Sequence, residues 1–123
     1  MTHSRRVLVV EDNAINGVLM AHMLRAWGCE VELAADATEA FECLAQQRPR
    51  LILLDLQLPD IDGFEVARRL KADPATATIP IIAVTGYSGA ETRQAALDAG
   101  CDDFATKPVD IHLLRAQVER HFG

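Results

Sequence analysis

Five polar residues that can bind metal ions or phosphoryl groups stand where short, mainly apolar segments of the chain end. They are Glu11, Asp12, Asp55, Thr85 and Lys107. Carboxylates are the ligands that hard cations such as Mg²⁺ prefer. An ammonium group and a hydroxyl group at the same place can hold the oxygens of a phosphoryl group. Together, these residue types suit metal-assisted phosphoryl chemistry.

Each of these residues also has an ordinary structural interpretation. Acidic residues after a strand are common in turns and helix caps, so Glu11 and Asp12 alone are consistent with either a site or a turn. Thr85 alone is typical of a satisfied strand residue, and Lys107 alone of a solvated surface charge. Acids, a hydroxyl group and a lysine at four different strand ends are harder to explain as caps. The joint pattern therefore favours a functional site.

The apolar segments that precede these residues are typical of strands buried in a sheet. Leu51–Leu54 is a continuous apolar run that ends at Asp55 and is followed by the turn residues Pro59 and Gly63. Residues 30–34 alternate instead, which predicts a half-exposed edge strand. The expected strands are Val7–Val10, Glu30–Ala34, Leu51–Leu54, Ile81–Val84 and Asp103–Thr106.

A helical pattern follows each strand. Asn13, Asp36 (with Glu39) and Asp110 are placed to cap helices, and Gly28 and Gly100 to end them. The helices are expected after Asn13, from Asp36 to about Gln47, over Phe64–Ala72, over Ala90–Ala99 and after Asp110. The residues expected on inner faces are Ile15, Val18, Leu19 and Met23, then Phe64, Val66, Ala67 and Leu70, and finally Ile111, Leu114, Val118 and Phe122.

Five strands that alternate strictly with five helices predict an α/β fold, with a parallel sheet, helices on both faces and right-handed crossovers. In such a sheet the carboxyl ends of the strands lie along one edge, where α/β folds place their sites. If the first and third strands are neighbours, Glu11 and Asp12 face Asp55. Converging carboxylates repel one another unless a cation lies between them. The pattern therefore predicts a Mg²⁺ site with a lysine beside it.

The overall composition is that of an ordinary globular protein, and we expect one domain over residues 1–123. Twelve basic and 18 acidic residues give a net charge of −6, and no basic run exceeds a pair, which argues against a nucleic-acid-binding surface. The three cysteines are far apart and form no C-x-x-C, so neither a disulfide framework nor a zinc site is indicated. No signal peptide or membrane-length apolar stretch is present, so a cytoplasmic location is expected.

Four motifs are spread along the chain between residues 7 and 110: VLVVEDN, LLDLQLPDIDGFE, AVTG and DDFATKPVD, in that order. In type and spacing they resemble the motifs of response-regulator receiver domains, the phosphoacceptor modules of two-component signalling. The resemblance implies a flavodoxin-like (βα)5 fold, a doubly wound, parallel, five-stranded sheet with the strand order 2-1-3-4-5. It also implies a cis peptide bond between Lys107 and Pro108.

The resemblance also implies a role for each polar residue. Asp55 is expected to accept the phosphoryl group, with Lys107 and the Thr85 hydroxyl beside it. Asp12, Asp55 and the backbone carbonyl of Gln57 are expected to hold Mg²⁺, with Mn²⁺ as an alternative, and Glu11 to act through water. Phe104 matches the aromatic residue that moves with the Thr85 hydroxyl during switching. The four histidines (His3, His22, His112, His121) fall outside this set and are expected to be surface residues.

The implied function is a signalling switch. A histidine kinase or a histidine phosphotransfer protein would donate the phosphoryl group, and the face formed by the last two helices and the last strand would then control a protein partner. Such a domain catalyses only its own phosphorylation and dephosphorylation, and binds neither nucleic acid nor a membrane directly. A stand-alone regulator is expected, with a receiver excised from a hybrid histidine kinase as the alternative.

Other classes of protein fit the sequence less well. A Mg²⁺-dependent phosphatase or phosphotransferase with Asp55 as nucleophile, of the haloacid-dehalogenase type, needs a second acid where Gln57 stands. A nucleotide-binding fold lacks both G-x-G-x-x-G and G-K-[ST]. A receiver that serves only as a constitutive docking module would not require Asp12, Asp55, Thr85 and Lys107 together.

Overall fold

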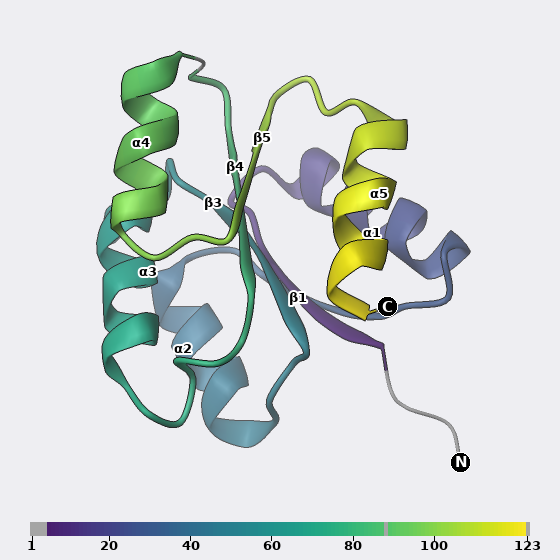
Figure 1. Ribbon diagram of the computed structural model, residues 1–123. Helices are drawn as coiled ribbons and strands as arrows, with labels where there is room; N and C mark the ends of the chain where they lie inside the picture. The colour runs from purple at the N-terminus through teal and green to yellow at the C-terminus, as the bar shows by residue number, and fades with distance from the viewer. Residues whose placement is uncertain (1–4, 88, 123) are drawn as a thin grey trace.

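The computed structural model describes residues 5–87 and 89–122, which form one parallel sheet flanked by helices (Figure 1). The sheet order is β2-β1-β3-β4-β5, and all four strand pairs are parallel, as the sequence predicts. The strands are β1 (Arg6–Val10), β2 (Glu30–Ala34), β3 (Leu51–Asp55), β4 (Ile81–Thr85) and β5 (Asp103–Thr106).

The helices divide between the two faces of the sheet. They are α1 (Ala14–Ala26), α2 (Ala37–Gln46), α3 (Gly63–Ala72), α4 (Ala90–Asp98) and α5 (Ile111–Phe122). Helices α1 and α5 cover one face, and α2, α3 and α4 cover the other (Figure 1). Each face has its own apolar core, because successive side chains of a strand point to opposite sides. Within the described residues, no helix has both the length and the apolar character to cross a membrane.

The three central strands are apolar along their length because both of their faces are covered. Every residue of β3 and β4 is buried, including Asp55 and Thr85 at their ends. The edge strand β2 is half-exposed, as its mixed sequence predicts, although Leu33 is 41% exposed rather than buried. The continuous apolar runs were therefore a reliable guide to burial in the sheet, and the alternating run was a less reliable one.

Side-chain caps start the helices at the predicted places. Asn13 Oδ1 accepts a hydrogen bond from the Asn16 N–H (3.0 Å) at the start of α1. Asp36 accepts from the Glu39 N–H (2.8 Å), and Asp110 accepts from two N–H groups at the start of α5. After α1 the chain passes through Gly28 at φ 86°, a left-handed conformation that favours glycine and ends the helix where expected.

Helix α1 buries a different face from the one predicted, which corrects the assignment of Ile15, Val18 and Leu19. These three side chains are 72%, 60% and 56% exposed, and Met23 is half-buried. The helix turns another stripe to the sheet, composed of Gly17, Met20, Ala21 and Leu24. This stripe follows the same i, i+3, i+4, i+7 spacing, and its small residues let the helix approach β1 and β2 closely.

The inner face of α3 is as predicted, whereas that of α5 needs correction. Val66, Ala67 and Leu70 of α3 are buried, with Phe64 packed beside them. In α5, Leu114 and Val118 are fully buried and Phe122 packs against the same core. Ile111, however, is 52% exposed, and Gln117 is buried instead.

The loop after β3 is attached to α2 by a single carboxylate. Asp60 accepts hydrogen bonds from the N–H groups of Ala37 and Thr38, both at 3.0 Å, and from the Thr38 hydroxyl at 2.9 Å. These bonds, led by that from Ala37, hold the pKa of Asp60 at about 2, well below its usual value. The helix N-terminus therefore fixes the loop that follows Asp55.

Gly63 is required because α3 begins in direct contact with the backbone of β3. A Cβ atom at this position would overlap the Leu56 Cα and lie 2.8 Å from the Asp55 carbonyl oxygen. Gly17 of α1 presents the opposite case: its added Cβ would meet Leu33 at an ordinary 3.7 Å. Both glycines are buried, but of the two only Gly63 lacks space for a side chain.

We expect opposite effects from alanine at these two glycines. Gly63→Ala forces α3 away from β3 and should lower the free energy of unfolding by about 1–3 kcal/mol or more. Gly17→Ala fills available space in mid-helix and should raise it by about 0.5–1 kcal/mol. Equilibrium denaturation by urea measures both changes. A neutral Gly63→Ala variant would contradict the close contact.

The Asp60 cap should make stability depend on pH in acid. Because the folded state lowers the pKa of Asp60 from 3.8 to about 2, its contribution is complete above pH 3.8 and is lost as the pH falls through about 2. The wild type should therefore exceed Asp60→Ala in stability near neutral pH, and the difference should shrink below pH 3.8. A difference that stays constant with pH would argue against the cap.

Candidate functional site

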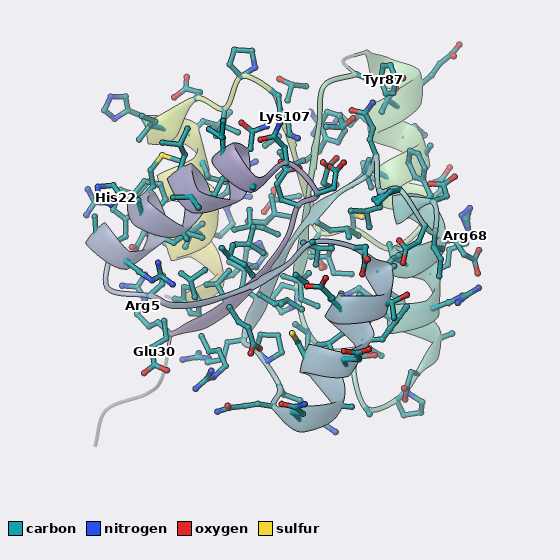
Figure 2. All side chains as sticks on the ribbon, turned by 180° about the vertical axis from the view of Figure 1, so that it is seen from behind. Arg5, His22, Glu30, Arg68, Tyr87 and Lys107 are labelled. Carbon is teal, nitrogen blue, oxygen red and sulfur yellow. The ribbon has the colours of Figure 1, made fainter. Side chains whose placement is uncertain are left out.

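The structure brings the five sequence-predicted residues together at the carboxyl edge of the sheet. They lie at the ends of four strands: Glu11 and Asp12 follow β1, Asp55 ends β3, Thr85 ends β4 and Lys107 follows β5. Figure 2 shows Lys107 at the same end of the molecule as Tyr87 of the loop after β4. The cluster arises because β1 and β3 are neighbours and all strands run in one direction.

The two acids after β1 differ sharply in environment. Glu11 is only 5% exposed, and its backbone N–H donates to the Ala34 carbonyl (2.9 Å), so that the pairing with β2 continues one residue past the strand. Its carboxylate accepts from the Asn13 N–H (3.2 Å). Asp12 is exposed at the mouth of the site. The pair therefore offers one buried and one accessible carboxylate.

Asp55 is held by hydrogen bonds to both of its oxygens. It is 3% exposed, and β3 pairs it with Val84 of β4. Its Oδ1 accepts from the Gln57 N–H (2.9 Å), and its Oδ2 accepts from the Lys107 ammonium (3.1 Å). These two hydrogen bonds fix the orientation of the Asp55 carboxylate at the edge of the sheet.

Lys107 is the cation between the two buried acids. Its Nζ lies 2.7 Å from Glu11 Oε1 and 3.1 Å from Asp55 Oδ2. Its own N–H donates to the Thr85 carbonyl (2.8 Å), which fixes the backbone next to β4. The peptide bond to Pro108 is cis, as the resemblance implies.

Glu11 and Asp55 share one cation, Lys107. The pKa values of Glu11 and Lys107 are both raised in this arrangement. Burial raises the pKa of Glu11, and the neighbouring Asp55 raises it further, because both disfavour a second negative charge. Burial alone would lower the pKa of Lys107, but its hydrogen bonds to Glu11 and Asp55 outweigh this and raise it. The site therefore stabilises added positive charge.

The donor set fits a divalent cation. Carboxylate oxygens of Glu11, Asp12 and Asp55 all lie within 4.8 Å of one another, close enough for one ion to contact them. Oxygen-only ligands with room for water are typical of Mg²⁺ sites. Burial raises the pKa of Glu11 and the neighbouring Asp55 raises it further, and a bound cation would favour the charged form of this carboxylate. We conclude that the residues present suit Mg²⁺.

The remaining predicted residues lie around this cluster. Thr85 is fully buried, and its Oγ1 accepts from the Tyr87 N–H (3.1 Å). The Gln57 side chain reaches across to the loop after β4, where its Oε1 accepts from the Gly86 N–H (3.2 Å). Phe104 is half-buried and packs into the core on the α2, α3 and α4 side. Gln57 therefore links the loop after β3 to the loop after β4.

An apolar groove of about 690 Å³ opens beside the acids, and the sequence analysis did not foresee it. It runs between α1 and the segment that joins β5 to α5. Its lining includes Glu11, Leu19, Met23, Lys107, Pro108 and Ile111. The residues wrongly expected in the core at Leu19 and Ile111 thus line a surface that leads to the site. The signal for it was that α1 carries two apolar stripes, of which the sheet needs one.

The histidines take no part in the acidic cluster. His22 is exposed and lines the outer part of the groove, and His112 is exposed on α5. His121 contacts Asp103, with Nε2 2.8 Å from Oδ2. His3 lies outside the described residues. None of the three described histidines is among the candidate metal ligands.

Comparison with known proteins agrees with this geometry. The family model of the response regulator receiver domain matches residues 7–119. The chain is 42% identical over 115 residues to the response regulator PleD of Caulobacter vibrioides, covering 94% of this chain but only 25% of PleD. It is 32% identical to the polar-differentiation response regulator DivK of Brucella anthropi, and 97% of each chain is covered.

A solved structure gives the same picture. The receiver domain of the sensor histidine kinase PA1611 from Pseudomonas aeruginosa superposes with a TM-score of 0.86 at 34% identity, over 96% of this chain and 97% of that one. That structure holds a magnesium ion coordinated in its active-site cleft. With the family model spanning most of its length and the sheet order and acidic cluster in place, this chain belongs to the response regulator receiver domains of two-component signalling.

Proposed function

We propose that this receiver domain accepts a phosphoryl group on Asp55 from a histidine kinase or a histidine phosphotransfer protein. The observation that carries the proposal is the Lys107 ammonium, which lies within hydrogen-bonding distance of both Glu11 and Asp55. This arrangement leaves one carboxylate oxygen of Asp55 oriented by the Gln57 N–H and the other paired with a cation that can follow an incoming phosphoryl group.

In the transfer, an Asp55 carboxylate oxygen forms a bond to phosphorus as the phosphorus–nitrogen bond of the donor's phosphohistidine breaks. The electron pair of that bond returns to the imidazole of the donor. Lys107 moves its hydrogen bond from the carboxylate to a phosphoryl oxygen, which stabilises the charge spread over the transferring group. Water later hydrolyses the acyl phosphate. The domain thus catalyses only its own phosphorylation and dephosphorylation.

Asp12, Asp55 and the backbone carbonyl of Gln57 are the residues that would hold Mg²⁺, with Glu11 acting through water. The ion, Mg²⁺ or Mn²⁺, supplies charge neutralisation on the phosphoryl oxygens when bound. The mutual proximity of the acids supports this assignment, as does the magnesium-bound structure of the PA1611 receiver. Asp12 is the exposed member of the set and is the first that an ion from solvent would meet.

The switch is proposed to start at Thr85. Its hydroxyl is buried at the end of β4, next to Lys107, and would donate to the new phosphoryl group. Phe104, which pairs with Ala83 of β4, would turn inward as Thr85 moves. The surface formed by α4, β5 and α5 then changes and controls a downstream protein. A local charge event biasing a two-state element is a general mode of switching.

The exposed apolar side of α1 is proposed to receive the phosphate donor. Ile15, Val18 and Leu19 stand on it, and Leu19 also lines the groove that reaches Glu11 and Lys107. A donor histidine must approach Asp55 from this end of the molecule, so its carrier would cover these side chains. Apolar anchors at the centre of an interface usually carry most of its binding energy.

Two settings for the domain remain from the sequence analysis, and the comparisons support each. DivK, which this chain matches along nearly all of its length, supports a stand-alone regulator. PA1611, whose receiver belongs to a sensor histidine kinase, supports a hybrid-kinase domain. In both settings we propose a cytoplasmic domain over residues 1–123 that acts through protein contacts, without binding nucleic acid or a membrane itself.

Phosphorylation of Asp55 can be tested by intact mass. Incubation with acetyl phosphate and Mg²⁺ should add one phosphoryl group, about 80 Da, to the wild type. The adduct should be absent from Asp55→Asn and from samples treated with a chelator, because the nucleophile or the charge-neutralising ion is missing. Asp98→Asn, which removes an exposed acid of α4, is the matched control and should be phosphorylated normally. An adduct on Asp55→Asn would refute the assignment.

Donor docking can be separated from chemistry. Leu19→Arg should slow transfer from a phosphorylated histidine phosphotransfer protein by about tenfold or more, because it places a charge in an apolar contact. Phosphorylation by acetyl phosphate should be unchanged, since that donor needs no docking surface. Leu97→Arg, on the exposed side of α4, serves as the control. Equal slowing with both donors would mean that the substitution damages the site itself.

A further inference from the structure

Gln117 is a buried polar residue that the proposed mechanism does not use. It lies on α5 between Leu114 and Val118, both fully buried, and is itself 5% exposed. Its Nε2 donates a hydrogen bond to the Phe104 carbonyl of β5 (3.1 Å). Its Oε1 is buried and has no hydrogen-bond partner among the described residues. The amide nitrogen of Gln117 is thus hydrogen-bonded, whereas its amide oxygen has no partner among the described residues.

This arrangement is a poor one for stability alone. A buried acceptor without a partner is destabilising, and an apolar side chain of similar length would avoid the loss. Turning the amide over would be worse, since Oε1 would then face the Phe104 carbonyl, an acceptor against an acceptor. A residue that breaks a packing rule in this way is often retained for function.

The bond joins the two layers of the fold at a single residue of β5. The Phe104 ring packs into the core on the α2, α3 and α4 side, together with Ala96 and Cys101. The next residue, Ala105, points to the opposite core, which α5 covers. Gln117 reaches from α5 to the backbone of Phe104. The Phe104 ring therefore packs on the face covered by α2, α3 and α4, while its backbone carbonyl is hydrogen-bonded to α5 on the opposite face.

We propose that Gln117 is a positioning residue that couples Phe104 of β5 to helix α5, so that a change at Phe104 moves α5. The inference rests on the proposed function, in which phosphorylation of Asp55 shifts Phe104, and it adds the contact that carries the shift onward. When the Phe104 backbone moves, the side-chain amide of Gln117 stays hydrogen-bonded to the Phe104 carbonyl. Helix α5, which carries Gln117, therefore moves as well.

A second set of contacts between β5 and α5 lies farther from the site. Asp103 pairs with Arg120 (3.0 Å) and with His121 (2.8 Å) in the last turn of α5. These pairs anchor the beginning of β5 to the end of the helix, whereas Gln117 contacts the strand one residue closer to Lys107. In the proposed coupling, the Asp103 contacts hold the last turn of α5 in place, and Gln117 transmits the movement of Phe104 to the preceding turn.

The experiment compares variants by NMR, with beryllofluoride and Mg²⁺ as a stable mimic of the phosphorylated state. In the wild type, amide signals should shift around Asp55, Thr85 and Phe104 and also along α5. Gln117→Met keeps the length of the side chain and removes its donor. We expect it to keep the shifts around Asp55 and Thr85 but to lose most of those along α5.

Two further variants separate coupling from packing. Gln117→Lys keeps an N–H donor on a long side chain and should restore the α5 response. Gln94→Met makes the same replacement on α4, where the glutamine side chain donates to Asp98 (2.8 Å), and should respond as the wild type does. Thermal unfolding of Gln117→Met should occur near the wild-type temperature, because the loss of the unpaired Oε1 offsets the loss of the hydrogen bond to the Phe104 carbonyl.

The coupling would be refuted by an α5 response in Gln117→Met as large as that of the wild type. It would also be refuted if Gln117→Lys lost the response too, or if Gln117→Met unfolded far below the wild type, since packing would then explain the residue. Wild-type protein that shows no shift around Asp55 would instead disprove the proposed function, and the coupling with it.

Discussion

The ion pair of Lys107 with Glu11 and Asp55 is the interaction on which the rest of the structure depends. A parallel sheet necessarily gathers the carboxyl ends of its strands, and this chain places acids on two neighbouring strands there. Two buried carboxylates without compensation would oppose folding, since each charge is costly away from water. The lysine that compensates them comes from the far end of the chain, 96 residues after Glu11. Because Lys107 directly follows β5, the lysine reaches the two acids only when the last strand has joined the sheet.

The same arrangement explains which predictions from the sequence succeeded. Strands buried on both faces must be apolar throughout, so β1, β3 and β4 were recognisable as short apolar runs, and the polar residues at their ends located the site. Helices are less constrained. Helix α1 carries two apolar stripes with equivalent spacing, and only the sheet decides that Gly17 and Ala21 face inward. The contacts of Gln117 and Asp60 depend on residues distant in sequence, and nothing local marks either one.

β5 contributes side chains to both of the cores that lie on either side of the sheet. Its residues alternate between them, so Phe104 belongs to the core of α2, α3 and α4, and Ala105 to that of α1 and α5. β5 pairs with one neighbour only, which leaves its outer edge free to be held by a side chain rather than by another strand. An edge strand held in this way can shift without breaking a ladder of backbone bonds on both sides, whereas β3 and β4 cannot.

Helix α1 has an inner apolar stripe that packs on the sheet and an outer apolar stripe that is exposed. Its inner stripe is fixed by contact with the sheet, and its outer stripe, Ile15, Val18 and Leu19, contributes little to the packed core. Substitutions on the outer stripe are therefore expected to leave the packed core intact. Under the proposed function, such a helix would allow donor recognition to diverge among receivers of this architecture while the proposed chemistry at Asp55 stays the same.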